Sequence, residues 1–336
     1  SSANSKVKAI QRQNIDNVTF VDNIPSTVYD KSAQKIVNAD TTWDVSAQQD
    51  KSILAWYTTN DNNGSLKVYI GSDYEIFGNY NSSYLFTYLG YSTKCISTET
   101  ITNINLINVS SVFNMRGMFR MTGFKSMLTL DLGDNFDTSN VNNMITMFGD
   151  VGYEKMKNLK LGTKFNTSKV TNMEGMFWNT GYTAMTTLKL GDNFDTSKVT
   201  NMQNMFYTTG YTAMTTLNLG GNFDTSAVTN MSNMFNSTGY TAMTSLDLGE
   251  KFNTSEVTDM SHMFESTGYN AMTTLDLGSD FDTSKVTTME SMFKNTGYSV
   301  MGSLDLGKNF DTSNVENMKS MFDLCGHRQM VSLNLG

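Results

Sequence analysis

The chain has 336 residues, a formal net charge of −8 and a single proline. It contains no apolar run near the roughly 20 residues that a membrane span needs, and no basic segment followed by an apolar one that would indicate a signal peptide. It also lacks basic blocks that would follow a phosphate backbone or lipid headgroups, so we expect neither nucleic acid nor direct membrane insertion.

Residues 1–105 predict a small α+β capping domain. Residues 4–18 have the composition of a helix start, and residues 52–59 and 65–71 alternate as strands around Asn63-Gly64, a pair that favours a type I′ hairpin turn. Residues 97–110 look like a degenerate first coil, in which Ile107 takes the place of a later phenylalanine. We expect this region to cover the apolar end of a repeat array; separate ligand binding is the alternative.

Residues 106–336 contain eight copies of a 29-residue unit. The dipeptide Met-Phe ends at Phe119, Phe148, Phe177, Phe206, Phe235, Phe264, Phe293 and Phe322, and three methionines in each unit account for 24 of the 25 in the chain. No insertion breaks this register. Because a shifted coil would misalign every buried row, the constant period predicts a solenoid of stacked coils.

Each unit predicts one short parallel strand followed by one short helix. Around Leu246 and Leu248 apolar and polar residues alternate as in a strand, and Gly249 ends it, consistent with a positive φ.

The predicted helix spans about residues 255–267. Val257, Met260 and Met263 recur at helical spacing, Thr254 or Ser255 is placed to cap the first turn, and Gly268 fits the position after the last turn. The expected fold class is therefore an α/β solenoid.

Residues 184–194, "AMTTLKLGDNF", resemble a leucine-rich repeat, and residues 194–206, "FDTSKVTNMQNMF", resemble the repeats of the BspA-like leucine-rich family of bacterial surface proteins. Residues 43–57 and 69–86 resemble the segment that precedes such repeats. The similarity covers about residues 43–336. The unit departs from that family in its extra length and in threonine where the family often has cysteine, which only Cys325 retains. The resemblance implies a leucine-rich-repeat-like solenoid, a secreted or cell-wall-attached location, and adhesion to host or microbial molecules.

Catalysis is not expected. His262 is predicted to lie on a solvated face and His327 to replace an aromatic side chain in packing, and neither belongs to a nucleophile–base pattern. The paired methionines could ligate Cu(I), but their spacing favours core packing. Cys95 and Cys325 lie too far apart in a stretched solenoid for a disulfide. We expect no cofactor and no metal, although stacked aspartates leave calcium open.

At the strand centre the units differ in charge while their cores stay alike, so we expect this row to form a ligand-binding face. Its residues are Asp131, Lys160, Lys189, Asn218, Asp247, Asp276 and Asp305, with Asn334 in the last unit; the flanking hydroxyl row contains Thr187, Thr216, Ser245 and Thr274. Such a hydroxyl row also occurs in ice-binding solenoids, a third and weaker alternative.

The expected function is that of a non-catalytic binding or adhesion module for an extracellular protein or glycan. The alternative is a structural stalk that displays another domain from the cell wall. We expect a monomer at the cell surface, and a natural chain that continues past Gly336.

Overall fold

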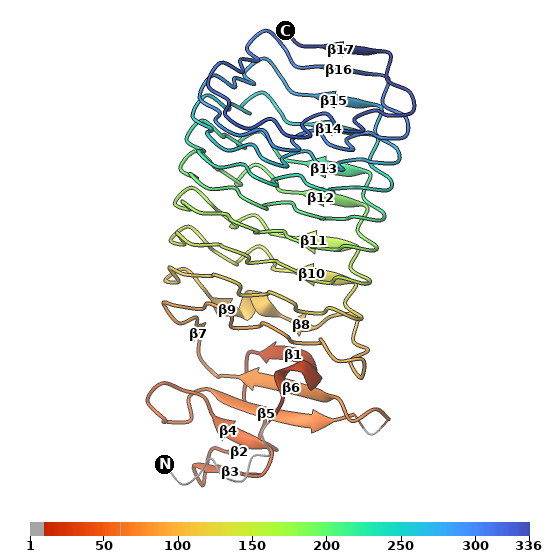
Figure 1. The fold of residues 1–336 in the computed structure, drawn as a ribbon. Coiled ribbons are helices and arrows are strands. Elements are labelled where there is room, and N and C mark those ends of the chain that lie inside the picture. Colours follow the sequence, from red (N-terminus) through yellow and green to blue (C-terminus); the bar gives the residue numbers. More distant parts are fainter. Residues whose placement is uncertain (1–9, 61) are drawn as a thin grey trace.

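The computed structural model describes residues 10–60 and 62–336. The chain forms a long stack of coils on top of an N-terminal sheet, with the C-terminus at the far end (Figure 1). Within the described residues there are seventeen strands and two 3₁₀-helices, η2 (Arg12–Asn14) and η3 (Ile104–Leu106), and no α-helix. The solenoid is therefore β-rich, and the prediction of one helix per coil is wrong.

Five strands form the N-terminal sheet in the order β4-β5-β6-β1-β8. Their bounds are β1 (Ile15–Val21), β4 (Thr42–Asp44), β5 (Leu54–Thr59), β6 (Leu66–Gly71) and β8 (Ile101–Thr102); β2 (Tyr29–Asp30) and β3 (Lys35–Ile36) form a separate hairpin. Strand β1 pairs in parallel with both β6 and β8, so it joins this sheet to the first coil.

The predicted hairpin is confirmed, because β5 and β6 pair antiparallel. Its turn is wider than a two-residue type I′ turn: the carbonyl oxygen of Asn60 accepts from the N–H of Gly64 at 2.8 Å, and Gly64 takes φ +67°. The predicted helix start is wrong where it is described, since Arg12–Asn14 is 3₁₀ and Ile15 begins β1; residues 4–9 lie outside the described residues.

A complete coil precedes the first repeat. Strand β7 (Ile76–Phe77) pairs in parallel with β9 (Ile107–Asn108), Asn81 forms a parallel bridge with Asn114, and Phe86 stacks on Phe119 at 5.5 Å. The part of this coil at residues 76–86 lies inside the region that we assigned to the cap, ahead of the degenerate first coil predicted at residues 97–110. The sequence carries a signal for them: Gly90 follows Phe86 at the spacing that separates phenylalanine and glycine in every later unit.

Each repeat contributes one three-residue strand, in which the central leucine points inward. The strands are β10 (Thr129–Asp131), β11 (Asn158–Lys160), β12 (Thr187–Lys189), β13 (Thr216–Asn218), β14 (Ser245–Asp247), β15 (Thr274–Asp276), β16 (Ser303–Asp305) and β17 (Ser332–Asn334). They pair in parallel and in register, as predicted, but in four separate two-stranded sheets instead of one continuous sheet.

A chain of tight turns takes the place of the predicted helix. The N–H of Met263 donates to the carbonyl oxygen of Met260 at 3.2 Å, three residues back, whereas the N–H of Phe264 donates to the carbonyl oxygen of Met292 in the next coil at 2.9 Å. An α-helix would direct every N–H to a carbonyl within its own coil. Since threonine, serine and asparagine are poor helix formers, the segment instead shares its N–H groups between its own turns and the neighbouring coil.

Two rows of buried threonines also connect the coils. The hydroxyl of Thr238 donates to the carbonyl oxygen of Phe206 at 2.6 Å, and that of Thr254 donates to the carbonyl oxygen of Asp282 at 2.7 Å. Both side chains are almost fully buried. Thr254 is therefore a link between coils, and the predicted capping role is wrong because there is no helix to cap.

The core runs without interruption from the N-terminal sheet through the coils. The Met-Phe phenylalanines form one column of stacked rings from Phe86 to Phe322, with centroids 5.5 or 5.6 Å apart. A second column runs from Tyr91 to His327. The strand leucines are buried as predicted except in the last coil, where Leu335 is 56% exposed because no further coil covers it.

We expect Thr238→Val to lower the free energy of unfolding by about 1 kcal/mol, because it preserves volume but removes one inter-coil hydrogen bond. The second repeat offers the reverse change: Val151 occupies the same row, so Val151→Thr should stabilise by adding a donor for the carbonyl of Phe119. Urea denaturation of both variants measures this. Equal stability of Thr238→Val and the parent would contradict it.

Removal of residues 1–100 should cause aggregation, because it strips the first coil and uncovers the buried side chains of Met115, Met118 and Phe119. Phe113 belongs to the same repeat but is already 39% exposed and stacks on Tyr80. Light scattering after size-exclusion chromatography gives the readout. As a control, replacing the β2–β3 hairpin with a short linker should be tolerated, since its side chains belong to a separate small cluster. A monomeric deletion with unchanged melting would refute the cap.

Candidate binding face

The exposed surface of strands β10–β17 is the candidate site, and we call it the strand face. Its strands lie in one column along the side of the solenoid (Figure 1). Two residues of each strand flank the buried leucine and point outward: a first-position row of mostly threonine and serine, and a last-position row that carries the charges. The residues that we expected at the strand centre lie instead at the last position, because leucine is the central residue of each strand. All of them are exposed: Asp131, Lys160, Lys189, Asn218, Asp247, Asp276, Asp305 and Asn334.

Aspartate and asparagine in the last-position row have a local structural role. Oδ1 of Asp247 accepts a hydrogen bond from the backbone N–H of Gly249 at 2.9 Å. Every other aspartate or asparagine of the row accepts the same bond from the glycine two residues after it. Gly249 takes φ +81°, as predicted from its position at the strand end. The carboxylate or amide thus fixes the turn that ends the strand.

Lys160 and Lys189 cannot make this bond, because lysine has no acceptor. Lys160 instead forms an ion pair with Asp131 of the preceding coil at 3.1 Å, with both side chains about half exposed. Within the described part of the chain Lys189 forms no ion pair. These two positions therefore depart from the residue type that the turn favours.

The first-position row is polar but largely free of side-chain links. Thr216, Ser245 and Thr274 are exposed, and Thr187 is half-buried. The residues just before the strands are different: the hydroxyls of Thr215 and Thr273 donate to carbonyl oxygens of the preceding coil at 3.3 and 3.2 Å.

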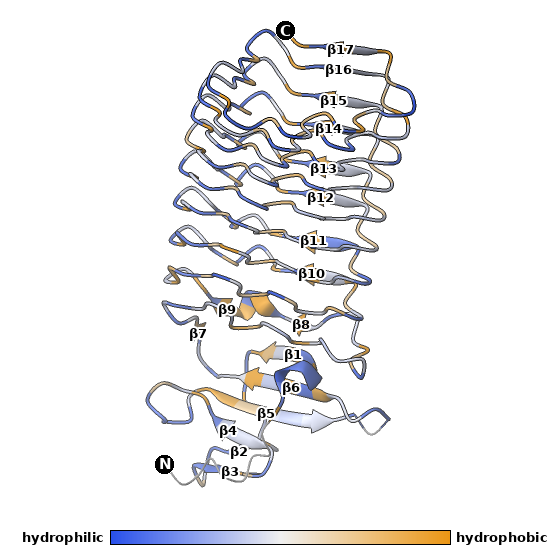
Figure 2. Ribbon diagram, viewed as in Figure 1, coloured by the Kyte–Doolittle hydropathy of each residue, from blue (hydrophilic) through white to orange (hydrophobic). Residues whose placement is uncertain are grey.

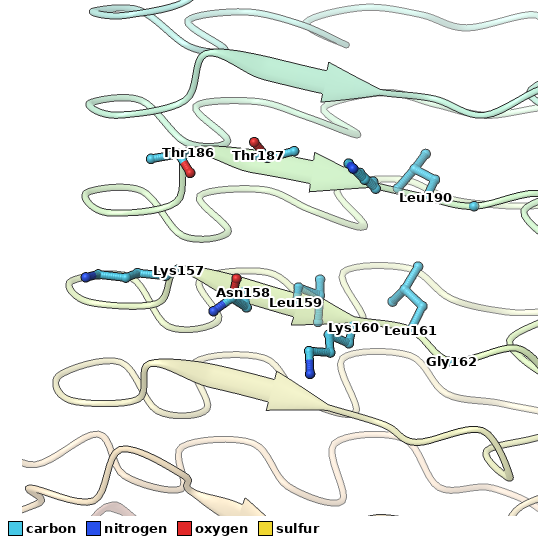
Figure 3. Close-up of a pocket in the computed structure, with 11 residues that line it drawn as sticks. Lys157, Asn158, Leu159, Lys160, Leu161, Gly162, Thr186, Thr187 and Leu190 are labelled. Atoms are coloured by element: carbon cyan, nitrogen blue, oxygen red, sulfur yellow. The ribbon is translucent and has the colours of Figure 1, made fainter.

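Shallow hollows interrupt the strand face. One of about 550 Å³ lies between β11 and β12, where two of the two-stranded sheets meet, and Lys157, Lys160 and Lys189 contribute to its lining. Figure 3 shows Lys160 on β11 and Lys157 just before that strand, with Thr187 on the neighbouring strand β12 and Thr186 just before it. Figure 2 shows β11 as a hydrophilic strand.

An acidic hollow of about 510 Å³ lies beside β14 and β15. Asp247, Glu250, Asp276 and Asp280 contribute carboxylates to it. Sequence reasoning missed Lys157, Glu250 and Asp280 as surface partners of the charged row, because the residue type at each of these three positions changes from unit to unit. Their contribution depends on how the loops after the strands turn back toward the face.

Catalytic or metal-binding geometry does not appear elsewhere in the described residues. Nδ1 of His262 lies 2.6 Å from Oε2 of Glu265, and His327 stacks on Tyr298. No group of three or more His, Cys, Asp or Glu in the described ranges is placed to hold a metal ion. The paired methionines, among them Met260 and Met263, are fully buried core residues, as predicted, except in the last unit, where Met318 is 47% exposed.

Both cysteines are free, as predicted. Burial raises the pKa of the Cys95 thiol and of the Cys325 thiol to about 12. At neutral pH they are thiols with little thiolate and are poor nucleophiles.

The repeats match the model of one protein family, described as "Mycoplasma protein of unknown function, DUF285", over residues 90–211, 180–295 and 242–331. Together these ranges span residues 90–331, well over half of the chain. The chain belongs to this family. The DUF285 match begins inside the first coil, in agreement with stacking that starts before the first repeat. No curated protein and no solved structure matches the chain. Among the described residues of this DUF285 protein, no helix is long and apolar enough to cross a membrane.

The role of the last-position row in stability can be tested by exchanging its two residue types. Asp247→Asn keeps the acceptor for Gly249 and should be nearly neutral, whereas Asp247→Ala should cost about 0.5–1 kcal/mol. Lys189→Asp should stabilise by several tenths of a kcal/mol, because it supplies an acceptor for the N–H of Gly191. Chemical denaturation of the three variants decides this. A destabilising Lys189→Asp would refute the argument that lysine is a structural compromise here.

Proposed function

We propose that this chain is a non-catalytic binding module that recognises an extracellular protein or glycan through the strand face. The observation that carries the proposal is the pair Lys160 and Lys189. At this row the turn favours aspartate or asparagine, and all six other units have one of them. Two adjacent lysines give up that bond and create a basic patch beside an acidic one. A surface selected only for stability would not need this departure.

The proposal includes a location outside the cell and membership of the BspA-like leucine-rich group, on the resemblance of the repeats. Adjacent like charges such as Asp247 and Asp276, directly opposite each other in β14 and β15, repel by under about 1 kcal/mol in water. Such a row favours a partner of complementary charge and a salt-dependent association.

A structural stalk is the second candidate. It is supported by the regular stacking, in which inter-coil backbone bonds, buried threonines and ring columns recur in every unit. A stalk requires a stiff core but no distinctive face, so the two candidates differ in what a change of surface charge would do.

The experiment is a pull-down of extracellular-matrix and bacterial surface material, comparing charge variants of the strand face. Changing Asp247, Asp276 and Asp305 together to lysine should change the bound material at least tenfold, with a strong salt dependence. The triple change to asparagine separates charge from folding, because it retains the acceptor for the glycine N–H. It should lower binding of cationic material while melting stays the same.

A matched control changes three acidic residues outside the strand face, Glu256, Glu316 and Asp323, to lysine; all three are exposed. Binding should survive this change. Loss of binding in the control with normal binding by the strand-face variants would place the contact surface on another side. Absence of binding by every variant and by the parent would favour the stalk.

A further inference from the structure

The charges of the strand face are arranged about a centre. Lysines on one side of that centre correspond to aspartates at the same distance on the other side. Counting coils outward from Asn218 on β13, Lys189 lies one coil before and Asp247 one coil after, while Lys160 lies two coils before and Asp276 two coils after. Reversing the order of the coils therefore brings each lysine to the place of an aspartate. Asn218, in the centre, is uncharged.

We propose that the strand face binds a second copy of this chain, face to face, with the two solenoids antiparallel and a two-fold axis along β13. A two-fold rotation about an axis parallel to the strands turns the second copy to face the first. The last-position row of one copy then lies over the last-position row of the other, and the order of the coils is inverted. Lys160 and Lys189 of each copy then lie over Asp276 and Asp247 of the other. In such an isologous contact each pair occurs twice, so the row supplies four ion pairs.

The loops that follow the strands extend the same pattern. Lys164 and Asp280 occupy equivalent positions two coils before and two coils after β13, and Asp134 and Lys308 occupy equivalent positions three coils away on either side. All four are exposed.

The hollows agree with this arrangement. The lysine-lined hollow between β11 and β12 falls opposite the acidic hollow beside β14 and β15, and the two have similar volumes of about 550 and 510 Å³. The long stems of Lys160 and Lys189 can therefore enter a recess lined by carboxylates.

Two positions bring like charges together: Asp131 with Asp305, and Asp192 with Glu250. At the first position, Lys160 lies 3.1 Å from Asp131 of its own chain; in the dimer this lysine is shared with Asp276 of the other copy and offsets part of the repulsion between Asp131 and Asp305. A two-fold axis along the row itself, by contrast, would place each coil opposite itself and bring lysine onto lysine and aspartate onto aspartate throughout the row. The charge order thus selects the antiparallel pair, in place of the monomer expected from the sequence.

This inference rests on the proposed role of the strand face as a contact surface and names its partner. The first experiment is sedimentation velocity of the full chain over a range of protein and salt concentrations. We expect a dimer at low salt that dissociates as salt rises. Lys160→Glu with Lys189→Glu, and separately Asp247→Lys with Asp276→Lys, should each weaken dimerisation at least tenfold.

The decisive experiment mixes these two charge-reversed variants. One variant is acidic along the row and the other basic, so together they should form a heterodimer that neither forms alone. The control, Lys169→Glu with Lys198→Glu, changes the same charge at exposed lysines off the strand face and should leave the dimer intact. Circular dichroism and melting confirm that each variant is folded. Two variants that stay monomeric when mixed would overturn the proposal.

The axis is tested with a cysteine at Asn218, which would meet its own copy on β13. Asn218→Cys should give a disulfide-linked dimer under mild oxidation, while Thr200→Cys, exposed on a different row, should not. The native thiols are buried or half-buried and will not obscure the result. A chain that is monomeric under all conditions, yet loses its pull-down partner when the strand face is altered, would refute the dimer and leave the proposed function standing. A dimer that captures no other partner in the pull-down would support the dimer and count against a separate extracellular ligand.

Discussion

The structure depends on hydrogen bonds that leave one coil and end in the next. In the turn segment, alternate backbone N–H groups such as that of Phe264 reach carbonyl oxygens of the following coil, while the N–H groups between them close turns within their own coil. Buried polar groups must be paired, so each coil needs its neighbour in one fixed register. An insertion in a repeat would leave several buried groups unpaired at once, which accounts for the unbroken 29-residue period.

The same constraint explains the composition of the buried rows. Thr238 and its equivalents combine a methyl group for packing with a hydroxyl that reaches the previous coil, and phenylalanine rings stack at the separation that the backbone sets. Polar residues with positive φ, such as Asn233 and His262, occur where the turns require a left-handed conformation. A helix-forming sequence would satisfy its own backbone and lose the stacking.

The strand face is the part of the molecule that this constraint leaves free. Its leucines are fixed by the core, and its aspartates and asparagines are favoured by the turn at the strand end. Lys160 and Lys189 follow neither requirement, so they are where a functional explanation is needed. The break in strand pairing between β11 and β12 falls beside them and opens the hollow that they line.

The sequence alone determined the coil period, the parallel strands, the inward leucines and methionines, and the exposed charged row, because a repeated contact leaves a repeated residue. It misled us about the helix: turns that advance three residues at a time space Val257, Met260 and Met263 as a helix would, and only the destination of each N–H distinguishes the two. The sequence indicated a degenerate first coil only at residues 97–110; its earlier part, which contains Phe86, escaped notice because 33 residues, not 29, separate Phe86 from Phe119. The division of the strands into pairs and the meeting of loop charges at the hollows were decided by tertiary structure, since they depend on how neighbouring coils settle on one another.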